Sequence, residues 1–177
     1  YILLLLYILM KLTLYMAMTV NGFIAKENDE TPWSEAEWLN FAKVVKKFKA
    51  IIVGRRTYEI MKKTNEFEKI GNPFTIILTN QNINNYDFFY FAKSPNEAIN
   101  LLKQKGFSKA LVAGGSKLNS SFMKENLIDE IILDIEPLIF GKGIKLFSEE
   151  KFETKLKLIG TKKLSKEVIQ LHYKVNR

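Results

Sequence analysis

The sequence predicts an α/β protein built on one mostly parallel sheet. Short apolar runs typical of buried strands alternate with amphipathic segments of helical period as far as Ile135. Beyond Ile135 only strand-like segments follow, which indicates an antiparallel edge on the parallel sheet. The chain has 177 residues, 47% of them apolar, enough to bury one substantial core. We therefore expect a single domain.

Each expected element follows from its local pattern. The strands are apolar runs bounded by glycine, proline or polar residues, and we expect them at residues 12–17, 50–53, 73–79, 88–91, 109–113, 128–135, 152–164 and 168–175. The helices show apolar residues at helical spacing, and we expect them at residues 35–48, 58–63, 95–105 and 118–125. Asn21-Gly22 predicts a sharp turn after the first strand.

The first helix carries an acidic residue with two possible roles. Ser34 suits the N-cap, and Glu37 stands at the third helical position, as in the S-x-x-E capping box. Glu37 is therefore either the capping partner of Ser34 or a free acid, with about equal weight. Asp129-Glu130 precedes a strand, and we interpret it as a junction feature rather than a site.

Composition excludes several kinds of site. The chain has no cysteine and only one histidine, His172, which argues against disulfides, thiolate or multi-histidine metal sites, and a His-dependent triad. We expect no metal. The net charge is +8, and residues 141–177 hold ten Lys or Arg against four Glu. Because apolar residues alternate with these lysines, a solvated strand face is the better interpretation than a nucleic-acid surface.

The first nine residues, 1–9, are all apolar or aromatic. A membrane span needs about 20 such residues, so this run is too short to cross a bilayer. We interpret it as an extension that need not be native, followed by one domain at residues 10–177. The absence of cysteine fits a cytoplasmic protein.

Three expected strands end in glycine-rich or polar turns: residues 54–57, 79–80 and 114–117. In open α/β sheets, ligands bind outside the carboxyl ends of the strands. Glycines let the backbone approach a ligand closely, and a following helix offers free N–H groups to a phosphate. Gly114-Gly115 alone is equally consistent with an ordinary turn. Arg55 and Arg56 strengthen the phosphate hypothesis, because arginine is not favoured at a helix N-terminus.

These motifs resemble those of a known superfamily. Residues 54–59 (GRRTYE) resemble the G-R-x-T-[WY]-E turn of dihydrofolate reductases, and Gly114-Gly115-Ser116 resembles that fold's G-G turn with its cis peptide. Residues 18–25 (MTVNGFIA) resemble the S-x-D-G-x-I-A segment in the reductase domain of bifunctional riboflavin-biosynthesis deaminase–reductases. Residues 127–130, followed by Pro137, Gly141, Gly143, Leu146 and Phe147, resemble another signature of that domain. The resemblance covers residues 10–175 and implies a dihydrofolate reductase-like three-layer fold.

The resemblance also implies the site. The expected NADPH-binding residues are Ala17, Gly54, Arg55, Arg56, Thr57, Thr79, Asn80, Gly114, Gly115, Ser116, Lys117 and Leu118. The expected substrate-binding residues are Thr19, Val20, Asn21, Gly22, Trp33 and Asp134, and the candidate catalytic residues are Glu37 and Asn21. Lys142 and Lys145 either meet a substrate phosphate or belong to a surface loop. Asn21 departs from the family's usual aspartate.

The implied function is NADPH-dependent reduction of a pterin- or pyrimidine-type substrate. The substrate that the resemblance most directly implies is 5-amino-6-(5-phosphoribosylamino)uracil of riboflavin biosynthesis. Dihydrofolate reductase activity and a non-catalytic nucleotide-binding role are the alternatives, and Asn21 in place of the usual aspartate keeps the latter open. Related reductase domains pair, so a homodimer is expected.

Overall fold

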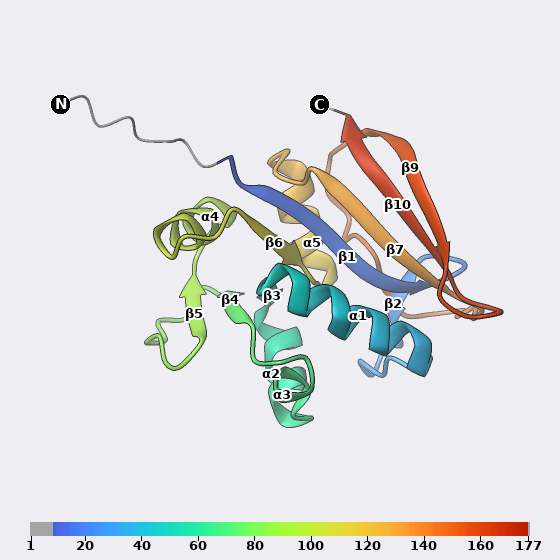
Figure 1. Ribbon diagram of the computed structural model, residues 1–177, viewed down its shortest axis with the longest axis horizontal. Helices are drawn as coiled ribbons and strands as arrows, with labels where there is room; N and C mark the ends of the chain where they lie inside the picture. The colour runs from blue at the N-terminus through green and yellow to red at the C-terminus, as the bar shows by residue number, and fades with distance from the viewer. Residues whose placement is uncertain (1–8, 177) are drawn as a thin grey trace.

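A computed structural model describes residues 9–176 and contains one central sheet (Figure 1). The sheet has eight strands in the order β5-β4-β3-β6-β1-β7-β10-β9. Their bounds are β1 Lys11–Thr19, β3 Ala50–Gly54, β4 Phe74–Leu78, β5 Phe89–Ala92, β6 Lys109–Val112, β7 Glu130–Glu136, β9 Lys155–Lys163 and β10 Ile169–Asn176. The apolar extension expected at residues 1–9 lies outside the described residues, except for Leu9.

The strand directions confirm the predicted architecture. β1 pairs in parallel with β6 and β7, and the ladder continues in parallel through β3, β4 and β5. β10 pairs antiparallel with both β7 and β9, which forms the expected antiparallel edge at the end of the chain. Such a sheet brings the carboxyl ends of its six parallel strands to one edge.

Helices cover both faces of the sheet, as Figure 1 shows for α1 in front and α5 behind. The helices are α1 Glu35–Phe48, α2 Arg55–Lys63, α3 Glu66–Lys69, α4 Pro95–Gln104 and α5 Ser116–Lys124. Val45 of α1 and Met61 of α2 pack on one face of the strands, and Leu102 of α4 and Phe122 of α5 pack on the other. Because successive strand residues point to opposite faces, the doubly covered strands are continuous apolar runs.

Some boundaries differ from those expected. α2 begins at Arg55, directly after β3, and α5 begins at Ser116, after the three residues that follow β6, because Gly54 and Gly115 are the N-caps. The short helix α3 and the short strand β8 Ile144–Lys145 were not expected. β8 pairs antiparallel with β2 Phe23–Ala25. Two residues are too few to show an alternation of apolar and polar side chains, so β8 is recognised only by its pairing with β2.

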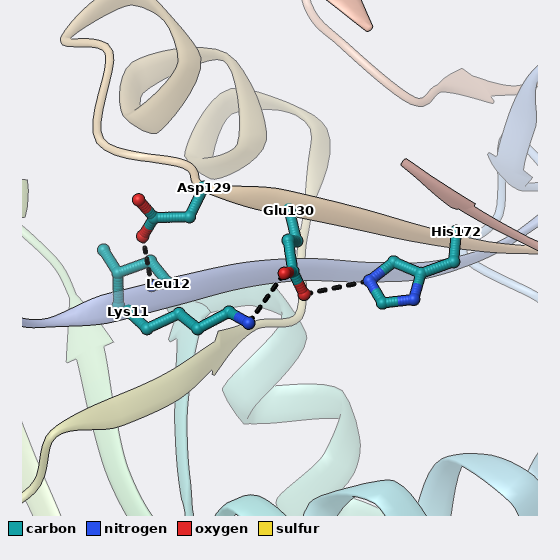
Figure 2. Close-up of polar contacts among 5 residues, drawn as sticks. All are labelled: Lys11, Leu12, Asp129, Glu130 and His172. Atoms are coloured by element: carbon teal, nitrogen blue, oxygen red, sulfur yellow. Dashed lines mark hydrogen bonds and ion pairs between the residues drawn. The ribbon is translucent and has the colours of Figure 1, made fainter. Parts of the chain in front are cut away.

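Figure 2 shows the amino end of β7, where Asp129 and Glu130 bind neighbouring strands. The Asp129 carboxylate accepts the Leu12 N–H at 2.8 Å, while Glu130 contacts Lys11 Nζ at 2.6 Å and His172 Nε2 at 2.9 Å. Burial alone would raise the pKa of Glu130, but the contacts with Lys11 and His172 hold it below its ordinary value. The pair therefore ties β7 to β1 and β10, at the edge away from the strand carboxyl ends.

Candidate functional site

Two of the predicted turns meet at the carboxyl edge of the sheet. The Gly54 N–H donates to the Gly114 carbonyl oxygen at 2.8 Å, and the Gly114–Gly115 peptide is cis. A Cβ added to Gly54 would lie 3.6 Å from the Gly115 nitrogen, and one added to Gly115 would lie 3.6 Å from Thr57 Oγ1. The same Gly54 position approaches Leu118 at 3.9 Å. The structure thus brings five predicted cofactor residues into one cluster.

Two helix N-termini at this cluster lack side-chain caps. Ser34 caps α1 and Ser94 caps α4, each by accepting a backbone N–H in the first turn. α2 and α5 instead begin at Gly54 and Gly115, without a side-chain cap and without an acidic residue in the first turn. Their free N–H groups suit an anion, and phosphate groups bind such N-termini in many proteins.

The other predicted phosphate ligands lie around this cluster but make internal contacts. Arg55 pairs with Glu59 at 2.7 Å, and Arg56 Nε donates to Asp29 at 2.8 Å. Thr79, at the end of β4, accepts the Gln81 N–H and lines a surface hollow. Lys117 lines a different hollow, between α5 and residues 148–150. Both arginines are exposed, so each could exchange its carboxylate partner for a phosphate.

A cluster of buried carboxyl groups lies between α1 and β7. Glu37 is 3% exposed, Asp134 0% and Glu136 2%. Burial, reinforced by the nearby Asp134 and Glu136, raises the pKa of Glu37 to about 8. The Glu37 carboxyl is therefore mostly protonated at neutral pH, although a carboxyl in water is ionised there.

Asp134 is held by hydrogen bonds from three elements. Its Oδ2 accepts from the Tyr15 hydroxyl and from Asn40 Nδ2 at 3.5 Å, and its Oδ1 accepts from Gln170 Nε2 at 2.8 Å. Burial raises the pKa of Asp134, and these hydrogen bonds oppose that rise. Burial raises the pKa of Tyr15 as well. Both Asp134 oxygens are thus occupied within the chain, whereas its predicted role was to bind substrate.

The capping-box interpretation is confirmed for Ser34 but is wrong for the Glu37 side chain. Ser34 Oγ accepts the Glu37 N–H at 3.2 Å, as expected of an N-cap. The Ser34 N–H, however, donates to Glu136 Oε1 at 3.0 Å, and the Ser34 hydroxyl donates to the same atom at 2.7 Å. Glu136 therefore takes the place that a capping box gives to Glu37. The Glu37 carboxyl is left for another role.

The turn at residues 20–22 contacts the segment at residues 137–143. Asn21 exchanges two hydrogen bonds with the backbone of Phe140, and the Phe140 ring stacks on Trp33 with centroids 6.3 Å apart. Gly22 has a φ of 88°, as its predicted turn requires. Val20 is exposed and Thr19 is fully buried, with its hydroxyl donating to Asn21 Oδ1. Val20, Asn21, Gly22 and Trp33 thus lie in or against the contact between this turn and residues 137–143, whereas the other predicted substrate residues, Thr19 and Asp134, are buried.

The sequence did not identify Tyr15, Asn40 and Gln170 as site residues. Asn40 lies one turn after Glu37 on the buried side of α1, and a polar residue on that apolar face was a usable signal. Tyr15 and Gln170 carried none, because only the register of β1, β7 and β10 brings them to Asp134. Ala17 pairs directly with Asp134 and is buried beside it.

Two kinds of feature are absent from residues 9–176. No group of three or more histidines, cysteines, aspartates or glutamates is arranged to hold a metal ion. Within the same residues, no helix combines the length and apolar character that a membrane span requires.

The chain is similar to a protein family, to a curated relative and to solved structures. A family described as the RibD C-terminal domain matches residues 10–170. The uncharacterized protein YwjB of Bacillus subtilis (strain 168) is 34% identical over 169 residues, which cover 92% of this chain and 97% of YwjB. A pyrimidine reductase-like protein from Corynebacterium diphtheriae has a similar structure, with TM-score 0.73 and 17% identity over 94% of this chain and 92% of that one.

A bifunctional enzyme contains the same fold. The Thermotoga maritima diaminohydroxyphosphoribosylaminopyrimidine deaminase/5-amino-6-(5-phosphoribosylamino)uracil reductase superposes with TM-score 0.71 and 20% identity. The match covers 94% of this chain and 57% of the Thermotoga protein.

Proposed function

The chain belongs to the RibD C-terminal domain family, and from that premise we propose that it is an NADPH-dependent reductase of a pyrimidine substrate. The observation that carries this proposal is that the glycine cluster at the ends of β3 and β6 and the buried carboxyl cluster near the end of β7 both lie toward the carboxyl edge of the sheet. The substrate class follows from the family and from the reductase activity named for the Thermotoga protein.

The residues at the carboxyl edge fit a phosphorylated dinucleotide. Gly54 and Gly115 leave the first N–H groups of α2 and α5 without side-chain caps, and those helices begin at neighbouring strands β3 and β6. Arg55 and Arg56 would supply charge for phosphate groups, with Arg56 assigned to the 2′-phosphate that distinguishes NADPH from NADH. Arginine suits this role because it binds phosphate with two parallel hydrogen bonds.

The buried acid fits the other half of the reaction. NADPH, when bound, supplies a hydride to an electrophilic carbon of the substrate. Reduction also needs a proton, and the Glu37 carboxyl holds one at neutral pH because its pKa is raised to about 8. Asp134 sustains that pKa through its charge and lies fixed by Tyr15 and Gln170. Trp33 and the residues 20–22 would exclude water from one side.

Thermal unfolding with each cofactor tests the proposal first. We expect NADPH to raise the melting temperature more than NADH does, because ligands that bind only the folded state stabilise it. No shift with either nucleotide would contradict the enzyme proposal. NADPH oxidation should then follow addition of 5-amino-6-(5-phosphoribosylamino)uracil. Oxidation on dihydrofolate alone would support the dihydrofolate reductase alternative, and binding without turnover would support a non-catalytic nucleotide-binding protein.

Two further proposals come from the sequence: a homodimer from the resemblance, and cytoplasmic residence from the absence of cysteine. The homodimer is tested by light scattering of the purified protein, where a monomer mass would contradict it. Cytoplasmic residence is tested by cell fractionation.

A further inference from the structure

Asn21 makes contacts that need a donor and an acceptor on the same side chain, which an amide provides and a carboxylate does not. Its Oδ1 accepts from the Phe140 N–H at 3.3 Å, and its Nδ2 donates to the Phe140 carbonyl oxygen at 2.7 Å. The Thr19 hydroxyl also donates to Oδ1 at 2.8 Å, and it accepts the Phe23 N–H at 3.0 Å. Thr19 thereby fixes which end of the amide is the acceptor. A carboxylate could keep two of the three contacts to Asn21 but would face the Phe140 carbonyl without a proton to donate.

The contacts of Asn21 hold the segment at residues 137–143 against the turn at residues 20–22. The Val20 N–H donates to the Leu138 carbonyl oxygen at 3.0 Å, so the turn is hydrogen-bonded to both Leu138 and Phe140 of the segment. The Phe140 ring lies nearly parallel to Trp33, with an interplanar angle of 12°. The position of the Trp33 ring therefore depends on the segment that Asn21 holds.

We propose that Asn21 is a positioning residue, which latches residues 137–143 to the turn at residues 20–22 and so holds Phe140 against Trp33. Its amide acts through that aromatic pair and takes no part in proton transfer. The proposal rests on the proposed function only in treating Trp33 as a wall of the substrate site. The latch itself is a property of the free protein. It also gives a physical reason for an amide where related proteins carry aspartate.

Fluorescence of Trp33 tests the latch without a substrate. Trp33 and Trp38 are the two tryptophans, so a Trp38→Phe background leaves Trp33 as the sole emitter. In this background, Asn21→Asp is compared with Asn21→Ser by acrylamide quenching at about pH 8 and about pH 3.5, on either side of the ordinary aspartate pKa. Asn100→Asp is the matched control, because Asn100 is exposed on α4, outside the latch. Far-UV circular dichroism checks that each variant is folded.

We expect Asn21→Asp to expose Trp33 at about pH 8. Loss of the amide donor should raise, by about tenfold, the ratio of molecules with residues 137–143 detached from the turn to molecules with them attached. At about pH 3.5 the protonated carboxyl can donate to Phe140 again, so quenching should return toward that of the parent. Asn21→Ser should be quenched more than the parent at both pH values, and it carries the test if Asn21→Asp unfolds. Equal quenching of Asn21→Asp and Asn100→Asp, or a pH-independent increase, would overturn the latch. Loss of reductase activity alone bears on the proposed function, since quenching needs no turnover.

Discussion

Replacing Glu37 by glutamine should change how the stability of the protein depends on pH. Glu37 is 3% exposed, and burial together with Asp134 and Glu136 raises its pKa from 4.5 to about 8. Glutamine has nearly the same shape but cannot ionise. The substitution therefore removes one titration from the folded protein while leaving the packing of α1 on β7 nearly unchanged.

The sign of the effect follows from proton linkage. The folded protein holds the Glu37 proton more tightly than the unfolded chain, so this stabilisation is complete below about pH 4.5 and is lost as the pH rises to about 8. Each pKa unit corresponds to about 1.4 kcal/mol, so the shift from 4.5 to about 8 corresponds to a loss of about 5 kcal/mol in the wild-type protein. Glu37→Gln should not show that loss.

Urea unfolding followed by far-UV circular dichroism measures the difference. We expect the free energy of unfolding of Glu37→Gln minus that of the wild type to increase steadily between about pH 5 and about pH 8. Glu35→Gln is the matched control, since Glu35 is exposed in the same turn of α1, and its difference should stay nearly constant. If the Glu37→Gln difference is also constant over this range, the pKa of Glu37 is not raised in the folded protein.

The other predictions concern the cofactor edge, the short sheet and the amino end of β7. Arg56→Ala should weaken NADPH about tenfold to a hundredfold and NADH little, by isothermal titration, because a charged hydrogen-bond partner of the 2′-phosphate is lost. Asp29→Asn, which frees Arg56, should not weaken NADPH; equal weakening of both nucleotides by Arg56→Ala would refute its assignment. Gly143→Ala should lower the free energy of unfolding by about 1–3 kcal/mol in urea, because its Cβ would lie 2.5 Å from the Ala25 carbonyl oxygen. Glu130→Gln should destabilise the protein above the lowered pKa of this carboxyl, and the deficit should shrink as the pH falls through that pKa; a deficit that grows in acid would contradict the ion pairs in Figure 2.

Local pattern sufficed for most of the fold. The run at residues 50–53 is buried on both faces, and a parallel strand of this kind is recognised from its continuous apolar character. The same pattern placed the glycine turns at strand ends, and parallel strands bring those ends to one edge. Gly54 and Gly115 could therefore be expected at the same edge of the sheet, whereas their close approach depends on the pairing of β3 with β6.

The carboxyl cluster could not be derived in this way. The Ser34 cap is completed by Glu136, 102 residues later, and nothing local distinguishes that partner from Glu37. Tyr15 reaches Asp134 across 119 residues, through the pairing of β1 with β7. Long-range strand register decides both contacts, while the sequence shows only that each residue lies on an amphipathic or apolar element. For the same reason Asn21 could be interpreted as a weakened catalytic residue, although its amide binds the backbone of Phe140.

Transfer of deuterium from NADPH labelled at the reactive nicotinamide carbon tests the proposed reductase most directly. The labelled cofactor is incubated with the protein and 5-amino-6-(5-phosphoribosylamino)uracil, and the reduced product is analysed by mass spectrometry. We expect one deuterium in the product with the wild-type protein and far slower formation of that product with Glu37→Gln, by about a hundredfold or more. A product without deuterium, or no product despite a measured NADPH affinity, would contradict the proposal.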